Sequence, residues 1–225
     1  GCGASKSELY PAKYFLANAS KKLRVAHYTA NEFNYDTPDW LGANTVVITA
    51  SLGGTTPETV KANGVASAAG ATVISLTHSA GSALDTSAHY SIIHGFEANY
   101  AAKLEKMGYA MALALELVQQ VEGYDKYEQM LAGFDKIFEV CENAAQSARK
   151  AAKKFAEQYK DAPVVYIMSS GASAEVAYSS SICLMMEMQW INSGSFHAGE
   201  FFHGPFEIVE KDVPFILLMN DGKTR

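Results

Sequence analysis

One stretch of sequence decides the fold class of this chain: residues 45–59, which read TVVITASLGGTTPET. Its first six residues are β-branched or small and carry no charge, which is typical of a strand buried on both faces of a parallel sheet. Its end favours a helix, because Thr56 can cap the N-terminus, Pro57 suits the first helical position and Glu58 complements the helix dipole. The stretch therefore predicts a strand–loop–helix unit, and with it an α/β fold.

The loop of this unit, residues 51–56, consists of Ser, Leu, Gly and Thr. Such a loop brings backbone N–H groups and hydroxyls to a helix N-terminus, where an anion can bind. It is not a Walker loop, because no Gly-Lys-Ser/Thr follows. The residues alone leave two interpretations open, a phosphate site and an ordinary turn between a strand and a helix.

Strands and helices alternate along the rest of the sequence. Apolar patterns predict further strands at 23–30, 71–77, 89–94, 163–168 and 214–219, and helices at 7–20, 57–69, 100–121, 124–159 and 174–190. We expect a parallel-sheet αβα sandwich with sites at the carboxyl ends of its strands. A long helical block divides the chain into two halves, and we place the domains at 1–122 and 123–225. The small-residue loops 2–5 and 169–173 each open a helix, a weak internal repeat that is consistent with two similar halves or with one continuous sheet.

Both ends of the chain read as interrupted elements. Residues 1–5 resemble the turn that follows a strand, and residues 221–225 resemble the turn after the strand at 214–219. We therefore expect an N-terminal strand and a C-terminal part to be missing from the two halves.

The bulk composition disfavours several classes of function. The chain has 225 residues and a net charge of −6, and 48% of its residues are hydrophobic. No extended basic cluster suggests nucleic-acid binding, and no run of about 20 apolar residues is long enough to span a membrane. The three cysteines are far apart and form no CxxC motif, which favours a reducing compartment. We expect a cytoplasmic protein that binds neither nucleic acid nor membrane.

A lone carboxylate within an apolar run marks a second candidate site. Glu187 stands between Met186 and Met188, where desolvation would raise its pKa. Further along, His203 precedes Gly204-Pro205, a turn that would set the direction of its ring. A carboxyl group and an imidazole can together move protons. The alternatives are a surface carboxylate paired with a lysine, and a structural histidine.

The spacing of His197, Glu200 and His203 by three residues invites a metal interpretation. Steps of three drift around a helix, and no signature of an open metal site accompanies them. We therefore expect neither a metal nor another cofactor.

Four segments together resemble the sugar isomerase (SIS) domain family, and the match covers nearly the whole chain. They are residues 1–5 (GCGAS), 31–35 (NEFNY), the loop at 51–56, and 199–205 (GEFFHGP). Within the family, the segments MEMQW, GEFFHGPFEI and GxTPET are similar to those of fructosamine-6-phosphate deglycases, which act on fructoselysine or fructose-amino-acid 6-phosphates. The isomerase domain of glucosamine-6-phosphate synthase is a more distant relative.

The resemblance implies a flavodoxin-like fold for each half and a role for each motif. It implies that a sugar phosphate binds the loop amides and nearby hydroxyls, at Ser5, Ser51, Gly53, Gly54, Thr55 and Thr56. Glu187 would move a proton on the open-chain sugar, and His203, from the neighbouring subunit of a homodimer, would help to open the ring or protonate an oxygen. The sequence departs from the synthase pattern in three places. Gly53 stands where the synthase has a loop serine, residues 99–103 lie where it has a Val-Ala-Ser-Thr segment, and no glutaminase domain is present.

Three functions follow from this resemblance. The first is a deglycase that cleaves a fructosamine 6-phosphate to glucose 6-phosphate and a free amine. The second is an aldose–ketose phosphosugar isomerase, or a synthase-like isomerase, that uses the same Glu187 and His203. The third is a non-catalytic SIS sensor of sugar phosphates. The presence of both proton-transfer candidates, and the lack of a basic helix-turn-helix, favour an enzyme over the sensor.

Overall fold

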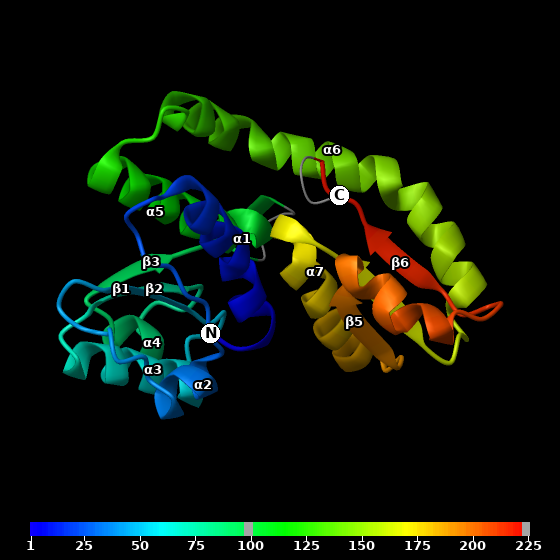
Figure 1. The fold of residues 1–225 in the computed structure, drawn as a ribbon, viewed down its shortest axis with the longest axis horizontal. Coiled ribbons are helices and arrows are strands. Elements are labelled where there is room, and N and C mark those ends of the chain that lie inside the picture. Colours follow the sequence, from blue (N-terminus) through cyan, green and yellow to red (C-terminus); the bar gives the residue numbers. More distant parts are fainter. Residues whose placement is uncertain (97–100, 222–225) are drawn as a thin grey trace. The chain divides into compact units, whose positions relative to one another are not determined.

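The structure, a computed structural model, describes residues 1–96 and 101–221 (Figure 1). It forms two compact units, unit 1 (Gly1–Val140) and unit 2 (Cys141–Arg225). The long helix α6 (Tyr127–Tyr159) contributes to both units, so this division falls within the helix, beyond the predicted boundary at 122/123. That the two predicted domains are both SIS domains stays a prediction.

Unit 1 contains a parallel sheet of three strands, in the order β1-β2-β3. The strands are β1 (Val46–Ala50), β2 (Thr72–Thr77) and β3 (Tyr90–Ile93), close to three of the predicted strands. Ala50 pairs with Leu76, and Thr77 with Ile93, so the carboxyl ends of the three strands meet at one edge. This edge is where an open α/β sheet places its ligands.

Helices cover both faces of this sheet (Figure 1). On one face, α1 (Gly3–Ala19) and α5 (Glu105–Glu122) pack through a core that includes Leu16, Leu76 and Val118. On the other, α2 (Ala30–Tyr35) and α3 (Pro57–Ala68) pack on β2, and the short helix α4 (Ala83–Thr86) also contacts that strand. The predicted αβα sandwich is confirmed for this unit.

A buried hydrogen-bond network ties α3 to the sheet. Asn63 of α3 is fully buried, and its Oδ1 accepts a hydrogen bond of 2.8 Å from Thr49 Oγ1. Its Nδ2 lies 3.0 Å from Ser75 Oγ, 3.2 Å from Leu84 O and 2.9 Å from Ser87 Oγ. Because buried polar groups are costly without partners, these bonds fix α3, and hence the loop that precedes it.

Unit 2 contains a second parallel sheet, in the order β5-β4-β6. Its strands are β4 (Val165–Ser169), β5 (Ser193–His197) and β6 (Phe215–Leu218). After β4 come the 3₁₀ turn η2 (Gly171–Ser173), the helix α7 (Ala174–Ser179) and a wide π-helical segment, η3 (Ser180–Met188). The 3₁₀ segments η4 (Ala198–His203) and η5 (Pro205–Ile208) follow β5.

Several local predictions are wrong. Residues 23–29 form no strand, and a cavity of about 500 Å³, lined by both Val25 and Val46, lies where they would pair with β1. Residues 30–35 form α2 instead of the end of that strand and the start of a loop. Strand β5 has no predicted counterpart, because its sequence, SGSFH, lacks a β-branched run.

Two further predictions fall partly outside the described residues. The helix predicted at 100–121 corresponds to η1 (Ala101–Leu104) and α5, and its first residue, 100, is not described. The replaced segment at 99–103 begins in the same gap. Residues 222–225, in the turn predicted at 221–225, also lie outside the described part.

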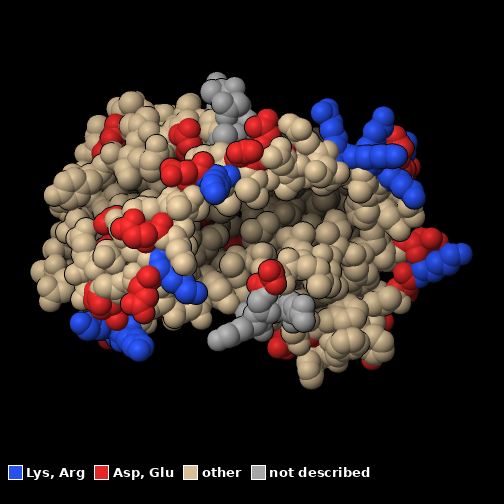
Figure 2. Space-filling view, turned by 90° about the horizontal axis from the view of Figure 1, so that it is seen from above, with Lys and Arg blue, Asp and Glu red and all other residues tan. Residues whose placement is uncertain are grey.

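The described residues contain no helix that could span a membrane, and the face drawn in Figure 2 carries no broad basic surface. Within residues 1–96 and 101–221, no helix has the length and apolar character needed to cross a membrane. On the face drawn in Figure 2, acidic and basic side chains are interspersed among uncharged residues. This view shows no continuous basic surface of the kind that binds a nucleic-acid backbone.

Candidate functional site

The loop at residues 51–56 connects β1 to α3 at the carboxyl edge of the first sheet, as predicted. Its backbone is tied to the end of β2, because Ser51 N donates to Leu76 O (3.2 Å) and His78 N donates to Leu52 O (3.0 Å). The hydroxyl of Thr77 donates to the same Leu52 oxygen over 3.1 Å. The loop is therefore held in one conformation by its neighbours before any ligand is present.

Gly54 is required by this conformation. Its φ of +66° lies in the left-handed region, and a Cβ at this position would stand 2.0 Å from Ser82 Oγ. Gly54 O also accepts a hydrogen bond of 2.9 Å from Leu84 N, which links the loop to α4. Gly53, by contrast, is exposed and has room for a side chain.

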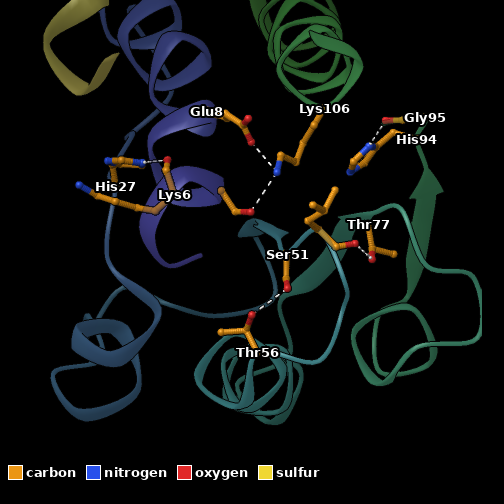
Figure 3. Close-up of polar contacts among 11 residues, drawn as sticks. Lys6, Glu8, His27, Ser51, Thr56, Thr77, His94, Gly95 and Lys106 are labelled. Carbon is orange, nitrogen blue, oxygen red and sulfur yellow. Dashed lines mark hydrogen bonds and ion pairs between the residues drawn. The ribbon is translucent and has the colours of Figure 1, made fainter. Parts of the chain in front are cut away.

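The hydroxyls of Ser51 and Thr56 are brought together at the two ends of the loop, 2.8 Å apart (Figure 3). Thr56 takes the predicted N-cap position of α3, but its side chain bonds Ser51 instead of capping the helix. One hydroxyl of the pair donates to the other, so the second retains its O–H for another acceptor. The first amides of α3 also lack intrahelical acceptors, so the pair adjoins a site suited to an anion.

Ser5 lies in the first turn of α1, and its environment includes two residues that the sequence analysis missed. Lys106 Nζ donates a hydrogen bond of 2.9 Å to Ser5 Oγ and forms an ion pair with Glu8 (Figure 3). Lys106 is 5% exposed, although it stands in the first turn of α5. The burial of Lys106 could have been predicted from the spacing of residues along α5. The lysine is followed at intervals of four by Ala110, Ala114 and Val118, which places it on the apolar face of that helix.

His94, directly after β3, is a third polar residue at this edge. It is 3% exposed, and its Nδ1 lies 2.8 Å from Gly95 O. A carbonyl oxygen only accepts, so we infer that Nδ1 carries the proton. Burial lowers the pKa of His94, so the ring is neutral at pH 7 and Nε2 carries a lone pair. Nε2 is buried and has no hydrogen-bond partner among the residues that the structure describes.

Glu187 lies near the end of the π-helical segment η3 in unit 2. The apolar side of this segment is anchored by Met185, which packs on Ile167 and Ala177. The expected desolvation of Glu187 is wrong for this structure, because its side chain is exposed together with its neighbours Met186 and Met188. The reason is the orientation of the side chains in this segment. Met185 points to the core of unit 2, whereas the side chains that follow it point to solvent.

His203 ends the segment η4, which packs on the second sheet through aromatic rings. The ring of Phe201 lies 6.5 Å from that of Phe196 on β5 and 6.1 Å from that of Phe215 on β6. The backbone turns sharply after His203, because Gly204 has a φ of +144°. His203 itself is exposed, beside Phe202, which is 78% exposed.

The structure therefore assembles the two sets of predicted residues to different degrees. Ser51 and Thr56 are in contact, and Ser5 is bonded to Lys106. Among the hydrogen bonds and ion pairs of the described residues, none joins Glu187 to His203 or engages either side chain. No group of three or more His, Cys, Asp or Glu within the described ranges could hold a metal ion.

Comparison with known proteins connects this geometry to one family. The family model for the SIS domain matches residues 1–120. Over 224 residues the chain is 40% identical to the fructosamine deglycase FrlB of Bacillus subtilis (strain 168), covering 100% of this chain and 68% of that protein. It is 26% identical over 224 residues to the fructoselysine 6-phosphate deglycase of Escherichia coli O157:H7, covering 100% of this chain and 65% of that protein.

A solved structure and a more distant relative complete the comparison. A crystal structure from Salmonella typhimurium LT2, described as a phosphosugar isomerase, aligns with a TM-score of 0.94 and 42% identity, covering 100% of this chain and 69% of that one. The isomerizing glutamine–fructose-6-phosphate aminotransferase of Thermotoga maritima is 25% identical and is covered over 37% of its length, against 98% of this chain. The chain spans about two thirds of the length of the deglycases.

Proposed function

Because this chain belongs to the SIS domain family, we propose that it processes a phosphosugar as an enzyme. More closely, we propose a deglycase that cleaves a fructosamine 6-phosphate to glucose 6-phosphate and a free amine. The observation that carries this proposal is the 40% identity, over the whole chain, to a fructosamine deglycase. The loop with paired hydroxyls at the N-terminus of α3 supplies an anion site of the kind that such a substrate needs.

The reaction requires proton transfer at two adjacent carbons. The substrate carries its amino group on C1 and a ketone at C2. A base removes a proton from C1, which gives an enaminol, and reprotonation at C2 gives an imine at C1. Water then adds to the imine carbon and the amine departs, which leaves glucose 6-phosphate. One base and one acid for oxygen suffice, and each typically contributes about 10²–10⁴-fold to the rate.

The proposed roles follow the position and chemistry of each residue. Glu187 is the base that carries the proton from C1 to C2, and His203 helps to open the sugar ring or protonates an oxygen. The phosphate binds the hydroxyls of Ser5, Ser51 and Thr56 and the backbone amides of Gly53, Gly54 and Thr55. The exposure of Glu187 and His203 in the isolated chain means that other groups must cover them for efficient proton transfer.

We assign this cover to a second copy of the chain, in a homodimer whose His203 acts on the neighbouring subunit's substrate. The exposed side chains of Phe202 (78%), Met188 (66%) and Trp190 (90%) support this assignment, because large apolar groups near site residues favour an interface. Leu115, on the apolar helix α5, is 1% exposed and packs inside unit 1, so it is not part of this interface.

Mixing two inactive variants tests the shared site. If His203 acts across the interface, subunits with Glu187→Gln and with His203→Ala should recover activity when they are unfolded and refolded together. Random pairing would restore about a quarter of the parental activity, because half of the dimers would each hold one intact site. Light scattering should show a dimer. A fully active monomer, or no recovery in verified mixed dimers, would contradict a site shared between subunits.

The second candidate function is an aldose–ketose phosphosugar isomerase. One observation favours it, namely that the Salmonella structure at 42% identity is described as a phosphosugar isomerase. The same Glu187 could move a proton between C1 and C2 of fructose 6-phosphate. The isomerase forms no amine, so the two functions differ in their products.

A product assay decides between these functions. The full chain is incubated with fructoselysine 6-phosphate and with fructose-aspartate 6-phosphate, and glucose 6-phosphate and the free amino acid are quantified. A deglycase releases both in equal amounts. Formation of glucose 6-phosphate from fructose 6-phosphate without any cleavage of either amine would support the isomerase and reject the deglycase.

A further inference from the structure

Lys106 is a buried cation in an unfavourable place. Its side chain is 6% exposed, and it stands in the first turn of α5, where the positive end of the helix dipole repels an ammonium group. The ion pair with Glu8 compensates for this placement. A packed hydrophobic residue at the same position would avoid the cost of burying a charge, so the presence of a lysine here points to a functional role for its charge.

The bond from Lys106 determines which way the Ser5 hydroxyl can point. An ammonium group only donates hydrogen bonds, so Ser5 Oγ must be the acceptor over the 2.9 Å that separates the two atoms. The hydroxyl hydrogen of Ser5 is then directed away from Nζ and is available to an acceptor that is not part of the protein. Lys106 thus turns Ser5 into an oriented donor.

Ser5 and Lys106 face the same edge of the sheet as the loop at 51–56. The start of the chain lies against the end of β1, because a Cβ on Gly1 would stand 3.0 Å from Ala50 O. In Figure 3, Lys106 lies between Glu8 on one side and the bonded pair Ser51–Thr56 on the other. Two helix N-termini, those of α1 and α3, and one ammonium group therefore meet at this edge.

The buried Nε2 of His94 is an independent sign that a ligand completes this region. Within residues 1–96 and 101–221 this acceptor has no partner, and an unsatisfied buried acceptor is costly. In Figure 3, this nitrogen faces the side on which Lys106 lies. Lys106 and Glu8 are near enough to influence the titration of the His94 ring electrostatically. A hydroxyl group of a ligand would satisfy this lone pair.

We propose that Lys106 and His94 extend the phosphate site of unit 1: Lys106 attracts the phosphate and orients Ser5, while His94 Nε2 accepts a hydrogen bond from a substrate hydroxyl. The ligand class is therefore a phosphorylated polyol or sugar, bound by a charged donor at one end and a neutral acceptor at the other. This inference rests on the proposed phosphosugar function and adds to it two binding residues.

Calorimetric binding to the full chain tests the inference without requiring cleavage. The probes are inorganic phosphate, fructose 6-phosphate and fructose. Removing Lys106 alone would leave the half-buried Glu8 without its partner, so the informative variant is Glu8→Gln/Lys106→Met. Its Kd for phosphate and for fructose 6-phosphate should rise at least about 10-fold, the usual size of a lost hydrogen bond to a charged group. The matched control is Glu157→Gln/Lys153→Met, which removes an exposed ion pair with the same change in charge.

The variant His94→Phe tests the role of His94 separately from that of Lys106. It removes the acceptor but keeps a ring of similar size, so affinity for fructose 6-phosphate should fall at least about 5-fold while affinity for inorganic phosphate stays unchanged. Should the double variant fail to fold, Ser5→Ala tests the hydroxyl that Lys106 orients, and its Kd for phosphate should also rise.

The possible outcomes separate this inference from the proposed function. Parental affinities in the folded double variant would overturn the role of Lys106, and parental affinities in His94→Phe would overturn the role of His94. A chain that binds fructose 6-phosphate as described, but cleaves no fructosamine 6-phosphate, would reject the deglycase and leave the inference standing. A chain that binds none of the phosphorylated probes would overturn both.

Discussion

The two units hold their candidate site residues in opposite ways. In unit 1, the hydroxyls of Ser5, Ser51 and Thr56 are already engaged by neighbouring side chains of the same unit. In unit 2, Glu187 and His203 are exposed, and their side chains make no hydrogen bond within the described residues. A single chain therefore preorganises the candidate anion site but leaves the two candidate proton-transfer residues exposed.

The difference follows from what each task requires. Binding a phosphate needs donors in fixed positions, which local loops and helix N-termini can provide. Tuning a carboxyl group for proton transfer needs a surrounding of low polarity, which a small unit with a single sheet does not build at its surface. The comparison predicts that substitutions in unit 1 alter binding or stability, whereas substitutions at Glu187 alter turnover alone.

The largest effect is expected at Glu187. Glu187→Gln keeps the shape of the side chain but removes the base, so kcat for a fructosamine 6-phosphate should fall at least about 10²-fold. Substrate affinity and the circular dichroism spectrum should not change. Glu210→Gln, which alters another exposed carboxylate of unit 2, should retain parental kcat. Parental turnover by Glu187→Gln would make Glu187 structural, and Glu200 would be the next carboxylate to substitute.

The next effect concerns the stability of unit 1. Asn63→Ala would leave Thr49 Oγ1, Ser75 Oγ and Leu84 O with fewer partners in a buried place, which should lower the free energy of unfolding by about 2–3 kcal/mol. Urea denaturation measures this change. Asn18→Ala, at an exposed asparagine that bonds only Tyr14 O, serves as the control and should cost little. Equal stability of the two variants would show that the loop is not held through α3.

A smaller effect separates binding from chemistry. Thr56→Val removes one hydroxyl of the pair with Ser51, so KM for a 6-phosphate substrate should rise about 10-fold with kcat nearly unchanged. Steady-state kinetics measures both constants. Thr86→Val, at an exposed threonine of α4, should change neither. An unchanged KM in Thr56→Val would remove Thr56 from the phosphate site.

The smallest effect is a pH dependence of stability at His94. Burial lowers the pKa of His94, so the unfolded chain binds more protons than the folded chain once the pH falls below about 6.5, the usual value for histidine. Stability should therefore be constant above that value and decline below it, by at most about 1.4 kcal/mol per pH unit for one proton. Lys106 and His78 lower this pKa further, whereas the bond to Gly95 and the charge of Glu8 oppose the shift.

Thermal unfolding of the parent and of His94→Phe between pH 5 and 8 measures how much the ring of His94 contributes to the pH dependence of stability. The variant should lose the part of the acid destabilisation that the parent shows in this range, since its ring does not titrate. Identical pH profiles for the two proteins would show that the ring of His94 is accessible to water and to protons in the folded state.

Much of the fold could be predicted, because short apolar strands and capped helices are local signals. The unit at 45–59 is an example: a β-branched run, a glycine loop and Pro57 specify β1, the loop and α3 with little outside help. The prediction failed at 23–30, where an extended apolar run forms no ladder, and at β5, where a strand without β-branched residues is stabilised by pairing with β4. Both failures concern strand pairing, which depends on partners far away in the sequence.

The sequence by itself determined the α/β class and the strand–loop–helix unit at 45–59, because both depend on residues that are close together in the chain. It also singled out Glu187 and His203 as candidates. Only the tertiary structure decided that Lys106 donates a hydrogen bond to Ser5, 101 residues away, and that the side chain of Glu187 is exposed in its unit. The physical reason is that burial and long-range pairing are properties of packed surfaces. The spacing of a lysine relative to alanines predicts that it lies on the apolar face of its helix. The partner that neutralises its charge is set by the helix that packs against that face.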